Sequence, residues 1–246
     1  MRIINVKLIL EYDGSSFSGW QRQKDKVTVQ GEVESGLSKI LSQNVNLISS
    51  GRTDAGVHAR HQVANFKTDR NIPPRDIKKA LNSFLPKDVR IKSAQSVSLD
   101  FHARYSAKSK IYSYNIFTGE YISPFKARYF WHLSSDLDFY KMNKELKYIL
   151  GRHDFINFQA KGSSVKDTER TISSVFLKKY GNYYNVFIEA DGFLYKMVRF
   201  IVGTLIEVGR GKFEPKRLKS LLQPEGELRR GSVAPARGLF LWKVKY

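Results

Sequence analysis

A polar segment over residues 49–61 holds the residue types best suited to chemistry, among them Arg52, Asp54 and two histidines. Glycines at 51 and 56 allow a tight turn with exposed backbone, so Asp54 is expected on a constrained loop beside Arg52. This is a common way to present a reactive carboxylate. The same aspartate could equally serve as a turn residue, with its side chain bonded to its own backbone.

A metal site is a second interpretation of this segment. Asp54, His58 and His61 offer oxygen and nitrogen ligands of the kind used in hydrolytic metal centres. However, His61 lies among strand-like residues, where histidines at this spacing are commonly part of a polar edge or of the core. A metal-dependent phosphoesterase that uses these three residues therefore stands as a weaker alternative.

Basic and aromatic residues interleave over residues 101–114. Such a strip can neutralise phosphates and offer flat faces to unstacked bases. On a strand, Tyr112 and Tyr114 would share one face. The alternative is an amphipathic strand whose tyrosines are simply half-buried.

Residues 193–208 predict a long apolar helix that ends at Gly209. Its narrow polar stripe contains Lys196, Arg199, Gly203 and Glu207. Periodicity alone places Arg199 in solvent or in a surface ion pair. A buried Arg199 would require a carboxylate partner, and Asp54 would qualify.

Two α+β halves, over residues 1–104 and 105–246, are expected to position these side chains. Strands are predicted at 6–12, 47–50, 62–66, 89–97, 111–117, 175–180, 184–188 and 239–246. Helices are predicted at 29–41, in a segment that Pro73-Pro74 opens and Pro86 follows, at 138–150 with Asp138 as N-cap, at 193–208, and in a short segment led by Pro215. The two successive units suggest a pseudo-repeat with a cleft between the halves. A basic loop at 160–168 could be a flap over a polyanion or an ordinary solvated loop.

Composition narrows the class of partner. The 246 residues carry 42 Lys and Arg against 23 Asp and Glu, a formal net charge of +19, which favours a nucleic acid. A membrane surface is less favoured, because the basic residues are spread along the chain and no stretch approaches the roughly 18 apolar residues of a membrane span. The absence of cysteine excludes thiol nucleophiles and Cys-based metal sites, and it fits a reducing cytoplasm.

Five blocks, spread from the first predicted strand to the last, carry a resemblance. They are YDG and GWQ within 12–21, GRTDAGVHA at 51–59, FHARYSA at 101–107 with Lys110 and Tyr112, the segment from GFLY at 192 to Leu205, and APARGL at 234–239. In order and spacing they resemble the TruA-type tRNA pseudouridine synthases.

That resemblance implies an enzyme that isomerises uridine to pseudouridine at positions 38, 39 and 40 of the tRNA anticodon stem-loop, without a cofactor. It implies the pseudouridine synthase fold: two α+β halves that share one extended, mostly antiparallel sheet, with helices packed on it and a basic cleft. It further implies a cytoplasmic homodimer in which one tRNA touches both subunits.

The resemblance also implies roles for particular residues. Asp54 would be the nucleophile, Arg199 would form an ion pair that orients Asp54, and Tyr112 would stack on the target uracil and could relay a proton. Further substrate contacts would come from Arg52, His58 and Leu194, and no metal is expected. The main rival is a non-catalytic RNA-binding or RNA-remodelling protein that uses the same basic cleft, which would require Asp54 or Arg199 to be missing or misplaced.

Overall fold

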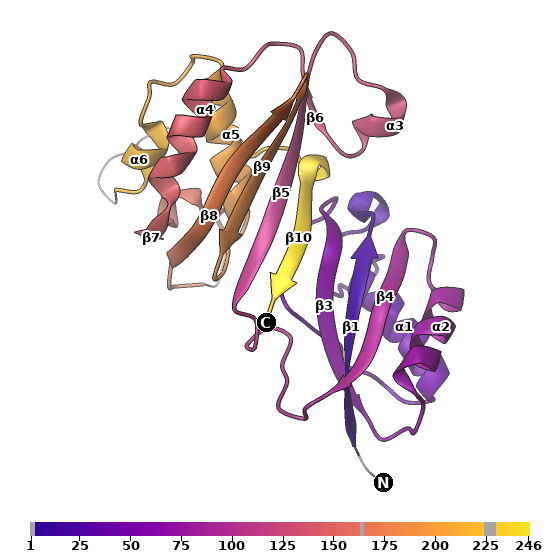
Figure 1. The fold of residues 1–246 in the computed structure, drawn as a ribbon. Coiled ribbons are helices and arrows are strands. Elements are labelled where there is room, and N and C mark those ends of the chain that lie inside the picture. The colour runs from indigo at the N-terminus through magenta and orange to yellow at the C-terminus, as the bar shows by residue number, and fades with distance from the viewer. Residues whose placement is uncertain (1–2, 163–164, 224–229) are drawn as a thin grey trace. The chain divides into compact units, whose positions relative to one another are not determined.

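The computed structural model describes residues 3–162, 165–223 and 230–246, and it divides into two compact units (Figure 1). The first unit contains residues 1–108 together with Phe240–Tyr246, and the second contains Ser109–Leu239. This division differs from the predicted halves at 1–104 and 105–246, because most of the last strand belongs to the first unit. Both units combine strands with helices, which confirms the predicted α+β class.

The first unit is built on a sheet in the order β4-β1-β3-β10, with the short β2 added beside β3. Its strands are β1 (Ile4–Tyr12), β2 (Ile48–Ser49), β3 (His58–Thr68), β4 (Val89–Val97) and β10 (Leu239–Lys245). Its helices are α1 (Val29–Leu41), α2 (Pro74–Phe84) and the 3-10 turn η1 (Gly14–Ser16). β1 pairs antiparallel with both β3 and β4, whereas β10 runs parallel to β3.

The core of the first unit lies between this sheet and its two helices. Alternate residues of β1, namely Val6, Leu8 and Leu10, are fully buried on one face of the sheet. Helix α1 contributes Val33 and Leu37 to the core, and α2 contributes Ile77 and Leu81. The period of two on the strand and of three to four on the helices explains why each element buries only one side.

The second unit contains a sheet in the order β5-β9-β8-β7, with β6 parallel to β5. Its strands are β5 (Ser109–Thr118), β6 (Trp131–Leu133), β7 (Gly151–Asp154), β8 (Glu169–Tyr180) and β9 (Tyr183–Ala190). Its helices are α3 (Pro124–Ala127), α4 (Phe139–Leu146), α5 (Met197–Gly209) and α6 (Arg217–Leu221), with 3-10 turns η2 (Lys147–Ile149), η3 (Ile156–Phe158) and η4 (Ala236–Gly238).

Several predicted ends of helices and strands are confirmed, and others lie at different residues in the structure. Asp138 caps α4 by accepting a hydrogen bond from the backbone N–H of Lys141 at 2.9 Å, as predicted. Helix α5 ends at Gly209 as predicted but begins at Met197 rather than at 193, because Lys196 adopts a left-handed conformation with φ of 61°. β3 begins at His58, four residues before the predicted start, and this places His58 on the strand.

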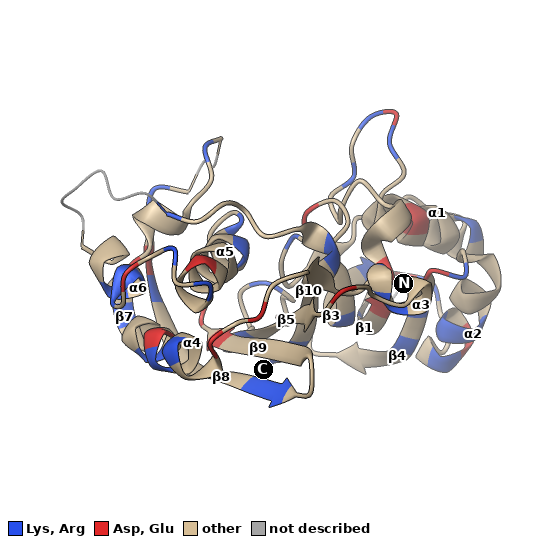
Figure 2. Cartoon of the chain, turned by 90° about the horizontal axis from the view of Figure 1, so that it is seen from above, with Lys and Arg blue, Asp and Glu red and all other residues tan. Residues whose placement is uncertain are grey.

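Lysine and arginine residues occur on helices of both units (Figure 2). Among the described residues we find no helix with the length and apolar character needed to cross a membrane. The predicted flap at 160–168 includes residues 163–164, which lie outside the described ranges.

Candidate active site

Asp54 lies in a turn immediately before β3. The backbone N–H of Val57 donates to the carbonyl oxygen of Asp54 at 3.1 Å, and Gly56 takes a left-handed φ of 75° that closes the turn. The Asp54 side chain is half-buried, between the buried Thr53 and the exposed Ala55. The predicted constrained loop is therefore present, with Arg52 exposed at its edge.

A second segment, residues 12–20, packs against this turn and holds it through hydrogen bonds; we call it the bracing segment. The Trp20 N–H donates to the carbonyl of Thr53 at 3.0 Å, and the Tyr12 hydroxyl lies 2.8 Å from the Thr53 hydroxyl. Burial raises the pKa of Tyr12, so its phenol keeps its proton and its hydrogen-bonding role across the physiological range. Thr53 is thus held from two sides directly before Asp54.

Two glycines allow this close approach. A Cβ on Gly14 would lie 2.6 Å from the carbonyl carbon of Val57, and a Cβ on Gly19 would lie 2.8 Å from the carbonyl oxygen of Thr53. Gly19 also has a φ of 93°, which disfavours any side chain. The sequence predicted no bracing role for these two glycines, although they belong to the YDG and GWQ blocks within residues 12–21.

His58 joins the same two segments, and its ring is fully buried and stacked on Phe240 with centroids 4.5 Å apart. Its Nδ1 accepts a hydrogen bond from the Gly14 N–H at 3.0 Å, and Asp13 Oδ1 lies 3.1 Å from the same nitrogen. Because one nitrogen cannot accept from Gly14 and donate to Asp13 at once, the two contacts belong to different protonation states. The ring is fully buried, and the predicted substrate contact of His58 stays a prediction.

The second unit carries the other predicted residues. Tyr112, on β5, is almost completely buried and meets Phe193 edge to face, with ring centroids 4.9 Å apart. Leu194 is buried just before α5, and its carbonyl accepts from the Met197 N–H at 3.1 Å. Both residues therefore lie near the segment that leads into α5, the helix that carries Arg199.

Arg199 is half-buried in the first turn of α5. Its Nε donates to the carbonyl of Ala234 at 2.7 Å, while the Ala234 N–H donates to the Arg199 carbonyl at 3.1 Å. A distant segment therefore covers part of the side of α5 that periodicity alone placed in solvent or in a surface ion pair.

Residues 230–234 provide this cover. A Cβ on Gly203 would overlap the carbonyl of Ser232, so only glycine permits the contact. The Gly231 N–H donates to the Thr204 hydroxyl at 3.0 Å, and the Arg230 guanidinium lies 3.6 Å from the centroid of the Phe200 ring. The part of the predicted stripe formed by Arg199 and Gly203 is thus packed against residues 230–234, and this contact fixes the backbone beside Arg199.

The sequence model of one family, described as tRNA pseudouridine synthase, matches residues 8–106 and 146–246. Among curated proteins, "tRNA pseudouridine synthase A 2" of Clostridium perfringens is 45% identical over 242 residues, covering 98% of this chain and 99% of that protein. "tRNA pseudouridine synthase A" of Thermoanaerobacter sp. is 45% identical and that of Acetivibrio thermocellus 46%, with the same coverage. The chain belongs to the tRNA pseudouridine synthase family.

Within this member of the family, the predicted site residues fall into two groups. Arg52, Asp54 and His58 lie in the first unit, and Tyr112, Leu194 and Arg199 lie in the second. All except Tyr112 fall within the residues that the family's sequence model matches. Each group lies within one unit, and the Arg199–Asp54 ion pair stays a prediction.

The metal interpretation can be examined in this synthase through its possible ligands. Across residues 3–162, 165–223 and 230–246, no group of three His, Asp or Glu side chains is placed to hold a metal ion. Of the three suggested ligands, His58 directs its Nδ1 toward Gly14 and Asp13. Nδ1 of His61 faces the backbone N–H of Val244 at 3.5 Å.

Proposed function

We propose that this protein isomerises uridine to pseudouridine at positions 38, 39 and 40 of the tRNA anticodon stem-loop, without a cofactor, as a cytoplasmic homodimer. The observation that carries the proposal is the placement of Asp54 on a loop braced by a second motif segment, in a chain 45% identical to named tRNA pseudouridine synthases over almost its whole length. The formal net charge of +19 supports a polyanionic substrate.

The reaction breaks the bond between N1 of uracil and C1′ of ribose, turns the base, and joins C5 to C1′ before the C5 proton leaves and N1 regains a proton. Atoms are therefore conserved, and no oxidant or reductant is needed. Asp54 is the proposed nucleophile, since a carboxylate can bond to the intermediate that forms when the glycosidic bond breaks. The bond to Asp54 breaks again as C5 joins C1′, which returns the free carboxylate. The loop supplies orientation, because Thr53 and Val57 fix the backbone on either side of Asp54.

The target base must leave the helical stem before it can react, which costs about a few kcal/mol of unstacking. Arg52 is exposed at the edge of the Asp54 turn and is proposed to hold the flipped nucleotide. Tyr112 is proposed to stack on the uracil and to relay the final proton, and Leu194 to contact the substrate. His58 is proposed to contact the substrate as well. We further propose that His58 positions the Asp54 turn through its bond to Gly14.

Arg199 is proposed to pair with Asp54 and to hold its carboxylate in the reactive orientation. Its guanidinium suits this role because one nitrogen, Nε, is already anchored on Ala234 and limits the rotation of the fork. The rival function, a non-catalytic RNA-binding protein, would leave Asp54 without a chemical role. A metal-dependent phosphoesterase would instead lose activity in the presence of chelators.

The test is to incubate the purified protein with an unmodified tRNA transcript, without added metal or nucleotide. Pseudouridine is then mapped by carbodiimide labelling and primer extension. We expect product only at positions 38, 39 and 40, and none from Asp54→Asn, which should still bind tRNA. Asp100→Asn, at an exposed aspartate of the same unit, is the matched control and should retain full activity. Substantial product from Asp54→Asn would remove Asp54 as nucleophile, and tight binding without any product would favour the RNA-binding function.

A further inference from the structure

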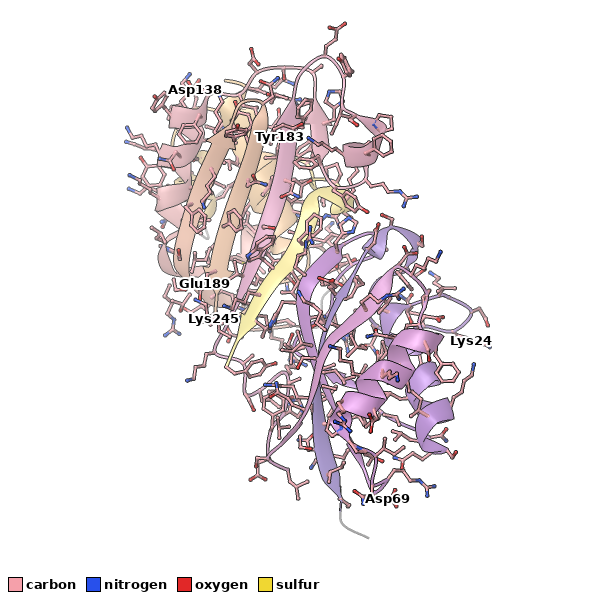
Figure 3. The ribbon with its side chains drawn as sticks, turned by 45° about the vertical axis from the view of Figure 1, so that its right-hand side comes forward. Lys24, Asp69, Asp138, Tyr183, Glu189 and Lys245 are labelled. Carbon is pink, nitrogen blue, oxygen red and sulfur yellow. The ribbon has the colours of Figure 1, made fainter. Side chains whose placement is uncertain are left out.

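Tyr114 lies on β5, two residues after Tyr112, and the proposed function gives it no role. Residues two apart on a strand point to the same face of the sheet, so the two tyrosines share a face. Figure 3 labels Tyr183 and Glu189 toward opposite ends of β9, and Tyr114 pairs with Val186 between them. The Tyr114 side chain is fully buried, so its phenol needs a hydrogen-bond partner within the protein.

The partner of the Tyr114 hydroxyl is a backbone carbonyl in the APARGL block. The hydroxyl donates to the carbonyl oxygen of Pro235 at 2.7 Å, a usual length for a well-formed O–H···O hydrogen bond. Burial raises the pKa of Tyr114, and the positive charges of Arg199 and Arg237 lower it by less, so the phenol keeps the proton that it donates. Both guanidinium groups therefore lie within electrostatic range of the Tyr114 oxygen.

The chain closes around the hydroxyl end of this ring. A Cβ on Gly238 would lie 2.7 Å from both Cε1 and Cζ of Tyr114, and Cζ is the carbon that carries the hydroxyl. The same Cβ would lie 2.9 Å from the carbonyl oxygen of Asn115. Trp131 of β6 meets the Tyr114 ring edge to face, with centroids 6.2 Å apart. These contacts leave the Tyr114 hydroxyl little freedom to move away from Pro235.

A single soft torsion separates this hydrogen bond from the one that holds Arg199. Arg199 Nε donates to the carbonyl of Ala234 at 2.7 Å, and Ala234 is bonded directly to Pro235. The Ala234–Pro235 peptide unit is planar, and the ring of Pro235 fixes its φ, which is −53° here. Only the ψ of Pro235 turns easily between the two carbonyl groups, so the orientation of one strongly limits that of the other.

We infer that Tyr114 is a positioning residue for Arg199: its hydroxyl fixes the Pro235 carbonyl and, through the rigid Ala234–Pro235 unit, the carbonyl that binds Arg199 Nε. Strand β5 then serves both residues, since it carries Tyr112 and orients Arg199 through Tyr114. Tyr114 takes part in no bond-making step and acts only through Arg199. The alternative is a core tyrosine that contributes packing and one buried hydrogen bond to stability alone.

The inference rests on the catalytic role proposed for Arg199, so the first measurement is one that needs no activity. In a nitrogen-15 spectrum of the full chain, the Nε–H signal of Arg199 is assigned as the one that Arg199→Lys removes. Tyr114→Phe keeps the ring and removes only the hydroxyl. The Arg199 signal should therefore shift, and its hydrogen should exchange with water about tenfold faster, because the bond to Ala234 is held less firmly.

Tyr184→Phe is the matched control. Tyr184 is a buried tyrosine of the neighbouring strand β9, and its hydroxyl donates to the carbonyl of Leu137 at 3.3 Å. The control therefore also loses a buried hydroxyl-to-carbonyl bond of the second unit, yet it should leave the Arg199 signal unchanged. Pro235→Ala is a second test variant: it keeps the carbonyl that Tyr114 binds but frees the φ between the two carbonyls, so the Arg199 signal should change again.

Steady-state kinetics with a tRNA transcript test the consequence for the reaction. Tyr114→Phe should lower kcat about 10-fold or more and leave KM for tRNA within about threefold, because a displaced Arg199 affects the reacting group rather than binding. In the Arg199→Lys background the same change should alter kcat by less than about threefold, because the Nε bond that it controls is already lost. Tyr184→Phe should leave kcat within about threefold of wild type.

The possible outcomes separate the inference from the proposed function. An Arg199 signal that Tyr114→Phe leaves unchanged overturns the inference. So does a kcat no lower than that of Tyr184→Phe, in an enzyme whose kcat Arg199→Lys lowers strongly, or a full loss of kcat from Tyr114→Phe in the Arg199→Lys background. A shifted signal together with normal turnover by Arg199→Lys would instead overturn the catalytic role of Arg199 and leave its positioning by Tyr114 intact.

Discussion

Replacing Gly14 with alanine tests whether the position of Asp54 depends on the bracing segment. The added Cβ would overlap the carbonyl oxygen of Val57 and lie 2.6 Å from its carbonyl carbon, whereas ordinary contacts begin at 3.4 Å, so the carbonyl must retreat by at least about 0.8 Å. Val57 is hydrogen-bonded to the carbonyl of Asp54 and closes its turn. A shift of the Val57 backbone therefore also moves Asp54, the proposed nucleophile.

The size of the effect follows from this displacement. A misplacement of about 1 Å at a reacting group can reduce the rate about 100-fold. Overpacking a close contact costs about 1–3 kcal/mol, which is less than the usual free energy of unfolding of about 5–15 kcal/mol. We therefore expect Gly14→Ala to remain folded and to bind tRNA within a few-fold of wild type, while kcat for pseudouridine formation falls about 100-fold.

Gly211→Ala is the matched control. An added Cβ there has no heavy atom within 4 Å, but the φ of 72° gives alanine a strained backbone. That strain costs about 1–2 kcal/mol, so the control loses a comparable amount of stability without displacing Asp54. Single-turnover rates at saturating enzyme, together with thermal unfolding, compare the two variants. A Gly14→Ala variant with kcat within about threefold of wild type would refute the bracing argument.

The remaining expectations concern the second unit. Arg199→Lys should lower kcat far more than stability, because lysine keeps the charge but loses the fork and the Nε bond to Ala234, a neutral-acceptor bond worth about 1–3 kcal/mol. If Arg199→Lys lowers kcat only as much as it lowers the folded fraction, or if it turns over normally with reduced thermal stability, Arg199 has a structural role only. Tyr112→Phe should retain tRNA affinity, and Tyr112→Ala should weaken it about 5- to 150-fold, since base stacking is worth about 1–3 kcal/mol. Equal affinities for the two variants, measured by filter binding, would exclude stacking by Tyr112.

Local sequence signals predicted the elements whose ends depend on near neighbours. Asp138 caps α4 and α5 ends at Gly209, both as expected, and the short gap between the predicted strands at 175–180 and 184–188 is the Gly181-Asn182 turn that joins β8 to β9. Each of these features depends on residues within about one turn of helix or hairpin, so the information is contained in a short window.

Other features depend on contacts between distant parts of the chain. The cover over Arg199 comes from Ala234, 35 residues further along, and periodicity on one helix cannot report it. His58 was expected in a loop, yet it continues β3 because β10 pairs beside it, with Phe240 opposite. The local sign of the cover over Arg199 was Gly203, a glycine in an otherwise apolar helix, because a glycine lets another backbone approach closely.

The two units place their proposed functional residues in the same physical way. In each unit a segment distant in sequence packs its backbone against the element that carries the residue, and a glycine makes room: Gly14 beside the turn of Asp54, and Gly203 beside the first turns of α5. Side-chain rotation cannot relieve a contact between backbones, so these positions are fixed more firmly than a packed side chain would fix them. Asp54 and Arg199 are therefore each oriented by their own unit, and the proposed ion pair would be added to two sites that are already rigid.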